Sequence, residues 1–283
     1  MSTRVKIGVF KLGCIGCAPL LEYLLDERAE RKDIMVRVAG SGAKMAEEEA
    51  LEAAKTLVEF KPEFAIVVSP NAALPGPTKV REFLKESGIP TIVISDAPAK
   101  KIVEDLEGKG FGYIIVTADS MIGARKEFLD PAEMAIFNAD VIKVLAATGV
   151  FNIICRELDR VINAFKKGEK PELPKIVVNS ETAVEAAKFS NPYAKSKAIA
   201  AYEMAVSVAK LTTKACFKIK EWERYTLIAS AAHELMRYAA ILADEAREIE
   251  KYGDTLVRRP HSAKGKILEK TKLIEKPKEA GSQ

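Results

Sequence analysis

The stretch Val5-Lys6-Ile7-Gly8-Val9-Phe10, followed by Lys11-Leu12-Gly13-Cys14-Ile15-Gly16-Cys17-Ala18-Pro19, decides the fold class. The first part is a short, mostly β-branched run, which is typical of a buried strand. The second part is a turn containing glycines that leads into an apolar, helix-favouring segment. A strand that turns through glycines into a helix is the first half of a βαβ unit. We therefore expect a parallel sheet that begins at Val5.

Short apolar runs continue to alternate with amphipathic stretches up to about residue 180. The expected strands are Val5–Phe10, Ile34–Ala39, Phe64–Val68, Thr91–Ser95, Tyr113–Thr117 and Lys175–Val178. The expected helices between them lie near Ala18–Glu30, Ala43–Phe60, Thr78–Glu86 and Ala99–Glu107. Right-handed crossovers place such helices on both faces of the sheet. The predicted fold class is thus α/β, a Rossmann-like open parallel sheet joined to a helical bundle and a short C-terminal β segment.

The helical part has its own start signals. Asp130-Pro131-Ala132-Glu133 combines an N-cap aspartate, a first-turn proline and a glutamate three residues on, which opens a helix. Periodicity leaves open whether the helices over 131–167 cover the sheet or join the bundle. Further helices are expected from Ser180-Glu181 and from Asn191-Pro192. We predict an α/β cofactor-binding domain over 1–180, an oligomerising helical bundle over 181–252 and a β segment over 253–283.

Two of the later helices carry stripes that need a packing partner. One has alanines three or four residues apart, which permit a neighbouring helix to approach closely: Ala194, Ala198, Ala201, Ala205 and Ala209. The other, over 221–252, is about 45 Å long. Its expected stripe is Trp222, Tyr225, Ala229, Ala232, Met236, Ala239, Leu242, Ala246 and Ile249. A bundle shared between subunits would bury it, so we predict a homo-oligomer; a hairpin within one chain is the alternative. The tail near Lys266–Ile274 resembles a β segment, and another chain is a candidate partner for it.

Composition excludes several classes of protein. No apolar run approaches the ~20 residues of a membrane-spanning helix, and the N-terminus lacks the pattern of a signal peptide. Four scattered cysteines do not make a disulfide framework, which favours a reducing cytoplasm. The net charge of +4 is small against 44 basic and 40 acidic side chains, so we expect no nucleic-acid partner and no membrane partner. Abundant lysine and glutamate indicate a thermophilic source.

The glycine turn after the first strand is the first candidate site, because open parallel sheets bind ligands at the carboxyl ends of their strands. Its glycines would let backbone N–H groups approach an anion. A nicotinamide dinucleotide would also need an acid at the end of the second strand, which instead ends Ala39-Gly40-Ser41-Gly42-Ala43-Lys44. Asp33 lies at the opposite end of that strand. No Walker-type lysine closes a glycine loop, and Lys44 suggests a further anion site.

The pair Cys14 and Cys17 has the spacing of a redox dithiol or of half a zinc site. No second pair exists, and the two histidines, His233 and His261, lie in the helical part and the tail. We therefore expect no metal, and the cysteines are interpreted as small lining of the loop. His233-Glu234 misses the zinc-protease helix motif because Arg237 replaces its second histidine, so His233 is expected inside the bundle.

Three further strand ends are rich in proline or hydrogen-bonding side chains. They read Ser69-Pro70-Asn71-Ala72-Ala73-Leu74-Pro75-Gly76-Pro77, then Ser95-Asp96-Ala97-Pro98, then Thr117-Ala118-Asp119-Ser120-Met121-Ile122-Gly123-Ala124-Arg125-Lys126. Each alone is an ordinary βα loop. In succession, at one edge of a sheet, they indicate a site for a flat ring system with an anionic tail.

These strand ends, together with Lys6-Ile7-Gly8-Val9-Phe10-Lys11-Leu12-Gly13-Cys14-Ile15-Gly16, resemble the coenzyme F420-dependent methylenetetrahydromethanopterin dehydrogenases of methanogenic archaea. The likeness extends over Asp130-Pro131, Asn191-Pro192-Tyr193 and the helix around Trp222. It implies reversible hydride transfer between 5,10-methylenetetrahydromethanopterin and C5 of oxidised coenzyme F420, in methanogenesis and one-carbon metabolism. It further implies F420 as a dissociable cosubstrate, no metal, no prosthetic group, and a homohexamer built as a trimer of dimers.

Such chemistry asks the protein mainly to hold two ring systems in contact and to exclude water. Hydride loss leaves a methenyl cation, which a carboxylate would stabilise. Asp96 and Asp119 are the candidate catalytic carboxylates, with helix N-capping as their alternative role. The expected coenzyme site comprises Gly13, Cys14, Ile15, Gly16, Cys17, Pro70, Asn71, Asp96, Ala97, Thr117, Ala118, Asp119 and Ser120, with Arg125 and Lys126 near the coenzyme's tail.

Two other functions remain in competition at this point: an NAD(P)-dependent Rossmann-type dehydrogenase and a non-catalytic oligomeric ligand-binding protein. The missing acid at the second strand end argues against the first. The second would keep the sheet and the bundle but show no turnover. Turnover with the deazaflavin and the methylene pterin would separate all three.

Overall fold

A computed structural model describes residues 4–26 and 30–280. Its strands are β1 (Val5–Lys11), β2 (Ile34–Gly40), β3 (Phe64–Ser69), β4 (Thr91–Ser95), β5 (Gly112–Val116), β6 (Lys175–Val178), β7 (Leu268–Glu269) and β8 (Lys278–Glu279). The helices of the first half are α1 (Cys17–Asp26), α2 (Glu47–Phe60), α3 (Pro75–Glu86), the 3-10 helix η1 (Ala97–Ile102) and α4 (Val103–Gly108). Those of the second half are α5 (Pro131–Thr148), α6 (Val150–Lys167), α7 (Ser180–Ala187), α8 (Pro192–Phe217) and α9 (Trp222–Tyr252).

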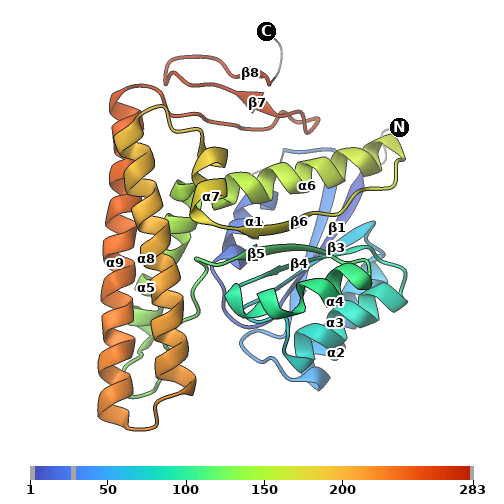
Figure 1. The fold of residues 1–283 in the computed structure, drawn as a ribbon. Coiled ribbons are helices and arrows are strands. Elements are labelled where there is room, and N and C mark those ends of the chain that lie inside the picture. Colours follow the sequence, from blue (N-terminus) through green and yellow to red (C-terminus); the bar gives the residue numbers. More distant parts are fainter. Residues whose placement is uncertain (1–3, 27–29, 281–283) are drawn as a thin grey trace.

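Six strands form one parallel sheet in the order β2-β1-β3-β4-β5-β6 (Figure 1). β1 lies between β2 and β3, so that Val9 is aligned with Val38 on one side and Ile66 on the other. The order of winding therefore reverses between β1 and β3. The predicted α/β class with an open parallel sheet is confirmed, and the reversal marks the usual ligand-binding edge of such sheets.

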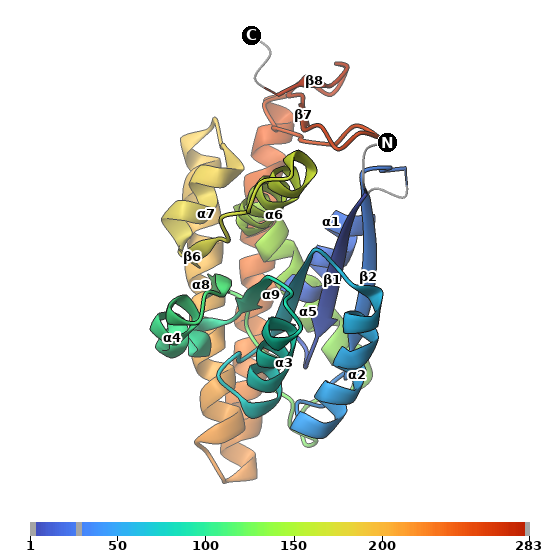
Figure 2. The same ribbon diagram turned by 90° about the vertical axis from the view of Figure 1, so that its right-hand side faces the viewer.

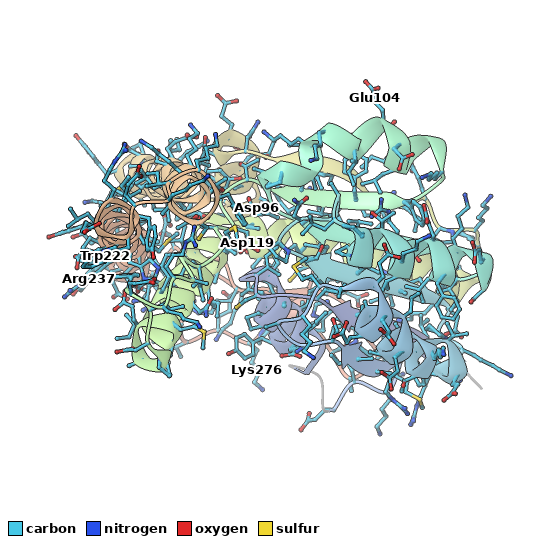
Figure 3. All side chains as sticks on the ribbon, turned by 90° about the horizontal axis from the view of Figure 1, so that it is seen from below. Asp96, Glu104, Asp119, Trp222, Arg237 and Lys276 are labelled. Atoms are coloured by element: carbon cyan, nitrogen blue, oxygen red, sulfur yellow. The ribbon has the colours of Figure 1, made fainter. Side chains whose placement is uncertain are left out.

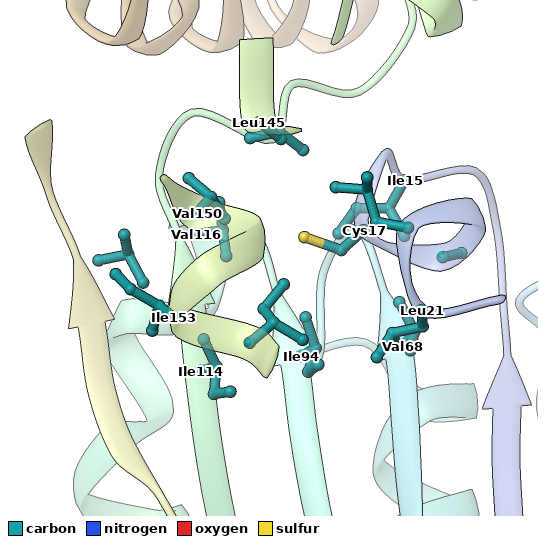
Figure 4. Close-up of a cluster of buried hydrophobic side chains, with 14 of the residues drawn as sticks. Ile15, Cys17, Leu21, Val68, Ile94, Ile114, Val116, Leu145, Val150 and Ile153 are labelled. Carbon is teal, nitrogen blue, oxygen red and sulfur yellow. The ribbon is translucent and has the colours of Figure 1, made fainter. Parts of the chain in front are cut away.

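Helices cover both faces of the sheet because the side chains of each strand alternate between two apolar cores. α1 and α6 cover the face that carries Val9 and Ile66, whereas α2 and α3 cover the face that carries Phe10 and Val67. Figure 1 shows α6 above the sheet and α3 and α4 below it. Figure 4 shows the first core around Cys17, with residues from α1, α5, α6 and the middle strands of the sheet.

The two helices over 131–167 divide between the parts of the molecule. α5 packs against α8 and α9, whereas α6 lies on the sheet, where Phe165 stacks on Phe64 of β3 at 5.6 Å between ring centroids. The chain bends by 68° between the two helices, at Gly149. The φ of Gly149 is 108°, a backbone conformation that glycine adopts readily and other residues rarely adopt. Seen along the sheet in Figure 2, the bundle lies behind the α/β part.

The predicted helix starts are confirmed in the bundle and shifted in the sheet domain. Asp130 accepts a hydrogen bond from the Glu133 N–H at 2.7 Å, and Asn191 accepts one from the Tyr193 N–H at 2.8 Å. α2 begins at Glu47 rather than Ala43, because Ser41 to Lys44 form a turn with the Ser41 hydroxyl on the Lys44 carbonyl. α3 begins earlier than expected, at Pro75, since proline is tolerated in a first turn. Of the helix expected over Ala18–Glu30, residues 27–29 lie outside the described residues, and Glu30 stands in a turn.

The alanine stripe of α8 and most of the α9 stripe are buried where the two helices pack against each other within one chain. Trp222 is the exception. It is 57% exposed because it stands at the first position of α9, beyond the end of α8. The burial of the two stripes follows the hairpin that the sequence left as the alternative, and it does not require a second subunit. Among the described residues no single helix is long and apolar enough to cross a membrane; only the bent α5–α6 pair meets that test, by length and composition alone.

The predicted C-terminal β segment is present as β7 paired antiparallel with β8 in the same chain. The segment is anchored to α6 by the His261 Nε2 atom, which lies 2.8 Å from the carboxylate of Asp159. Gly265 packs tightly here: a Cβ atom at this position would lie 1.9 Å from Asp33 Oδ2. The tail thus closes over the amino-terminal side of the sheet, away from the strand ends that carry the candidate site.

Candidate active site

The loops after β1, β3, β4 and β5 meet at the carboxyl edge of the sheet, next to the bundle. Asp96 follows β4 and Asp119 follows β5, and Figure 3 shows both between the bundle and the sheet. The sequence prediction that these loops lie at one edge is therefore confirmed. The loops differ in what their side chains contact.

Asp119 is fully buried and holds the start of α1. Its Oδ1 accepts a hydrogen bond from the Gly16 N–H at 2.6 Å, and its Oδ2 accepts one from the Cys17 N–H at 2.8 Å. The carboxylate therefore caps α1 from a distant loop, where the helix dipole favours negative charge. Burial outweighs these hydrogen bonds and raises the pKa of Asp119 to about 6.

Asp96 is the N-cap of η1 and is 3% exposed. Its Oδ1 accepts a hydrogen bond from the Ala97 N–H at 2.5 Å. Burial, and after it the nearby charge of Asp119, raises the pKa of Asp96 well above its usual range. Both predicted carboxylates thus perform the capping role that the sequence offered as the alternative, and they place two buried acids at the strand tips. Their catalytic role stays a prediction.

The raised pKa of Asp119 predicts opposite effects of pH on activity and stability. Below pH 6 the protonated group can no longer accept from both N–H groups, so we expect kcat/KM to fall as pH decreases through about 6. Because this pKa lies above the usual 3.8, the group lowers the free energy of unfolding as pH rises from about 4 to about 6.

Both profiles are measured on the wild type and on Asp119→Asn. Ionisations of the substrates affect the two enzymes alike. The ratio of the wild-type kcat/KM to the variant kcat/KM at each pH therefore reports the ionisation of Asp119 alone. If that ratio did not change between pH 5 and pH 7, another group would govern the acid limb.

Thr117 and Ser120, in the loop after β5, point into the protein and tie the loop to α8. The Thr117 hydroxyl donates to the Val178 carbonyl at 3.1 Å and lies 3.0 Å from the Tyr202 hydroxyl. The Ser120 hydroxyl donates to the Ala205 carbonyl at 2.9 Å. Ala118 is also buried. These three predicted coenzyme contacts therefore lie in the seam between the sheet and the bundle.

Replacing Tyr202 with phenylalanine should lower the free energy of unfolding by about 1 to 2 kcal/mol, because its buried hydroxyl donates to the Val178 carbonyl at 2.8 Å. Thr117 retains its own bond to that carbonyl, which limits the loss. Denaturant unfolding measures the change, with Tyr238→Phe on the exposed face of α9 as the control. Equal stability of the two variants would contradict a stabilising role of the Tyr202 hydroxyl between α8 and the sheet.

The carboxyl edge of the sheet, formed by the loops after β1, β3, β4 and β5, is here called the strand-tip edge. The part of it that is open to ligands lies at the β1–α1 loop, residues 12–16. A pocket of about 580 Å³ lies between this loop, the first turn of α1 and the end of β2. Gly13, Cys14 and Ile15 line it, and Lys11, paired with Glu22, stands at its side. Three of the predicted coenzyme residues thus face a space that can hold a ligand.

Glycine is required at two positions of this loop by close packing. A Cβ atom at Gly13, where φ is 69°, would lie 2.9 Å from both Met45 Sδ and Pro70 Cδ. A Cβ atom at Gly16 would lie 2.6 Å from Val141 Cγ1 and 2.9 Å from Asp119 Oδ1. The second glycine lets α1 approach both its capping carboxylate and α5.

The loop after β3 is rigid rather than open. Pro70 is buried, and Asn71 forms a turn in which its Oδ1 accepts from the Ala73 N–H at 3.1 Å. The Ser95 hydroxyl, from the end of β4, donates to the Ser69 carbonyl at 2.7 Å and accepts from the Ala72 N–H at 3.0 Å. Asn71 remains partly exposed beside the candidate site.

Arg125 and Lys126 lie farther along the same chain segment as Asp119. The Arg125 guanidinium donates to the Cys216 carbonyl at the end of α8 and lies 4.6 Å from the ring centroid of Tyr225. Lys126 is exposed. Arg125 thus joins the loop to the bundle, and the contact of both residues with the coenzyme's tail stays a prediction.

The cysteines and histidines do not gather into a metal site within the described ranges: no group of three or more potential ligands occurs there. Cys17 is buried in the first core, and burial raises the pKa of its thiol well above its usual range. His233 lies inside the bundle, as predicted, with its Nδ1 2.7 Å from Glu133 Oε1 and its ring stacked on Phe137.

Sequence reasoning missed two residues that complete the edge. Tyr202 joins α8 to the loop after β5, and Asn138 of α5 meets the exposed Cys14, with its Oδ1 3.7 Å from the Sγ. Tyr202 could have been suspected as a large polar side chain on an alanine stripe. Nothing in the sequence pointed to Asn138, because the periodicity of α5 did not show whether this helix lies on the sheet or in the bundle.

Comparison with known proteins supports the family resemblance. The family model described as methylene-5,6,7,8-tetrahydromethanopterin dehydrogenase matches residues 5–278. The F420-dependent methylenetetrahydromethanopterin dehydrogenase of Archaeoglobus fulgidus is 62% identical over 273 residues, 96% of this chain and 99% of that protein. The protein of the same name from Methanocaldococcus jannaschii is 54% identical over 274 residues, with the same shares covered.

A solved structure has the same fold throughout. It is that of an F420-dependent methylene-tetrahydromethanopterin dehydrogenase in complex with methylene-tetrahydromethanopterin and coenzyme F420. It superimposes with a TM-score of 0.94 at 46% sequence identity, covering 98% of this chain and 100% of that chain. With a family model and close relatives that all span nearly its full length, the chain belongs to the methylene-5,6,7,8-tetrahydromethanopterin dehydrogenase family.

Proposed function

We propose that this chain catalyses reversible hydride transfer from 5,10-methylenetetrahydromethanopterin to oxidised coenzyme F420, forming 5,10-methenyltetrahydromethanopterin and reduced F420. The observation that carries the proposal is the full-length match to a structure that holds both substrates, at a TM-score of 0.94 and 46% identity. At this level of likeness the loops that follow the strands are shared along with the fold.

The site of the reaction is the strand-tip edge. Its position at the reversal of strand order, the pocket beside the β1–α1 loop and the bundle alongside support this. Gly13, Cys14 and Ile15 contact the coenzyme directly. Asp119 acts on it through the Gly16 and Cys17 N–H groups, whose positions its carboxylate fixes.

Positioning and electrostatics account for the chemistry that the protein must supply. The coenzyme is the hydride acceptor, so the protein holds the two rings in contact and keeps water away. As hydride leaves, positive charge develops on the pterin. The buried carboxylate of Asp119, with its pKa of about 6, is ionised at neutral pH and favours that charge, because charges act strongly where water is excluded. Asp96 would add to this effect only in its ionised form, which burial disfavours.

Nicotinamide coenzymes fit this edge poorly. β2 ends at Gly40, where an acid would be needed to hold the adenosine ribose. The acid of that strand, Asp33, lies at its other end, 2.7 Å from Arg31 and 3.0 Å from Lys166. Burial alone would raise its pKa, but hydrogen bonds from these two cations lower it to about 2. Asp33 is thus part of an internal ion cluster.

The proposal is tested by mixing the protein with methylenetetrahydromethanopterin and coenzyme F420 and following the absorbance of the oxidised deazaflavin. We expect a decrease with F420. In parallel mixtures that contain NAD or NADP instead of F420, the readout is the absorbance of the reduced nicotinamide, and we expect none to form. Reduction of a nicotinamide without reduction of F420 would favour the alternative dehydrogenase. A flat trace with both coenzymes would favour a non-catalytic binding protein.

We also propose that the chain functions as a cytoplasmic homohexamer, a trimer of dimers assembled through the bundle. Support comes from large apolar side chains that one chain leaves uncovered on α8 and α9, such as Tyr193 at 77% and Leu227 at 71% exposure. Light scattering coupled to gel filtration should give a particle six times the 30.9 kDa chain mass. A monomer at micromolar concentration would contradict the assembly without touching the chemistry.

A further inference from the structure

A cavity of about 900 Å³ lies between the end of α9, the α5–α6 junction and the C-terminal segment. Its floor is apolar and includes Ala146, Ala147 and Phe151. Lys143 and Ala147 lie on the side of α5 opposite Asn138, which meets the β1–α1 loop. The cavity is therefore separate from the strand-tip site, and its volume is that of a typical small-molecule pocket.

The wall of this cavity has more positive than negative charge. Seven lysine and arginine side chains line it, against three carboxylates. Protein groups already neutralise each carboxylate: Asp244 pairs with Lys143 at 2.6 Å, and Glu269 pairs with Arg259 at 2.7 Å. Asp159 pairs with Arg31 at 3.8 Å and is hydrogen-bonded to His261 at 2.8 Å. The remaining cations need another source of negative charge.

Three cations of the wall form no direct ion pair with a carboxylate among the described residues, although Glu248 and Asp244 lie near enough to Arg247 to favour its charge. Arg247 makes neither a hydrogen bond nor an ion pair there. Arg258 donates only to backbone carbonyls, those of Leu256 at 3.2 Å and Thr271 at 2.9 Å. Lys270 likewise donates only to carbonyls. Partial desolvation, followed by the positive charge of Arg258, lowers the pKa of Arg247, so the two guanidinium groups repel each other.

His261 adds an unsatisfied polar atom to the same wall. Its side chain is 3% exposed, its Nε2 is bound to Asp159, and its Nδ1 is buried with no partner in the described structure. Buried polar atoms usually find a partner. An unpartnered nitrogen and three cations that form no direct ion pair with a carboxylate thus occur together around one cavity with an apolar floor.

We propose that this cavity binds a small organic phosphate, with the phosphate on Arg247, Arg258 and Lys270 and the apolar part against Phe151. The planar fork of arginine donates two parallel hydrogen bonds that match the geometry of phosphate oxygens. The ligand would join α9 to the C-terminal segment, which supplies Arg258 and Lys270. Binding would therefore stabilise the tail on the bundle.

The test is calorimetric titration of the full-length native protein with adenosine 5′-monophosphate as the probe, beside adenosine and inorganic phosphate alone. We expect the monophosphate to bind at least tenfold more tightly than either part. Arg247→Gln should weaken it at least tenfold while leaving turnover unchanged, because Arg247 lies outside the strand-tip site. Arg237→Gln, an exposed arginine of the same helix (Figure 3), should have no effect on binding.

Three results would overturn the proposal: no binding of the monophosphate to the native protein, equal binding to wild type and Arg247→Gln, or displacement of the probe by coenzyme F420. The last would place the probe in the strand-tip site. Because turnover is assayed separately, failure of this proposal would be distinguishable from failure of the proposed dehydrogenase function.

Discussion

Replacing Asp119 with alanine should lower kcat/KM for coenzyme F420 by about 100-fold, the cost of misplacing a reactant by roughly 1 Å. The carboxylate is the only hydrogen-bond acceptor that the described residues offer to the Gly16 and Cys17 N–H groups. Without it these two buried donors lose their partner and the β1–α1 loop shifts. Loss of its negative charge also removes stabilisation of the developing cation.

The companion variants separate a positioning role from general destabilisation. Asp119→Asn keeps the size of the side chain and one acceptor oxygen, so its KM for F420 should lie between those of the wild type and Asp119→Ala. Its kcat/KM should not show the fall below about pH 6 that we expect of the wild type. Glu104→Ala, an exposed carboxylate on α4 (Figure 3), should match the wild type. If Asp119→Ala retained wild-type KM and kcat while only its melting temperature fell, Asp119 would be purely structural.

Replacing Gly149 with alanine should destabilise the protein by more than about 3 kcal/mol, the largest stability effect we expect from a single methyl group. Gly149 forms the bend between α5 and α6 with φ of 108°. A Cβ atom there would lie 1.9 Å from the carbonyl oxygen of Ala183, a backbone atom of α7 that cannot rotate away. Both the backbone strain and the clash must be relieved by moving α6 or α7.

Gly168→Ala is the matched control for Gly149→Ala. Gly168 also has a positive φ, 73°, and ends α6, but a Cβ atom there would meet nothing within 4 Å. Its substitution should cost only the strain of the left-handed conformation, about 1 kcal/mol. Thermal unfolding of the two variants measures the difference. Similar melting temperatures would mean that the packing of α7 on the bend does not restrain the chain.

The sheet could be predicted from sequence because its strands are short β-branched runs separated by turn residues, as at Thr91–Ser95, which is β4 in the structure. The edge at which loops meet followed from the parallel direction of the strands. Helix ends were less predictable. Trp222 matched the apolar period of α9 yet stays exposed, since a periodic pattern does not show where the neighbouring helix stops.

The candidate site was predicted as a set of loops but not as a set of side-chain orientations. Asp119 and Gly16 are 103 residues apart in the chain, and their hydrogen bond depends on how α1 packs against β3 and α5. Thr117 and Ser120 looked like ligand contacts because they are polar and follow a strand. Their hydroxyls instead bind carbonyls of β6 and α8, which sequence could not reveal before the bundle was placed beside the sheet.

Two functions of the strand-tip loops are therefore distinct. The β1–α1 loop faces a pocket and is the proposed contact of the coenzyme, whereas the loop after β5 fixes that first loop and the bundle in one arrangement. Such an arrangement suits a reaction in which the coenzyme carries the chemistry and the protein supplies geometry. It also predicts that acids which cap helices affect catalysis without touching either ring.

Isotope transfer tests whether hydride passes directly between the two bound substrates. The protein is given methylenetetrahydromethanopterin deuterated at the methylene carbon together with oxidised coenzyme F420 in ordinary water, and the reduced coenzyme is examined by mass spectrometry. Direct transfer should place one deuterium at C5 of reduced F420. Reduced F420 that carries only hydrogen from solvent would contradict it.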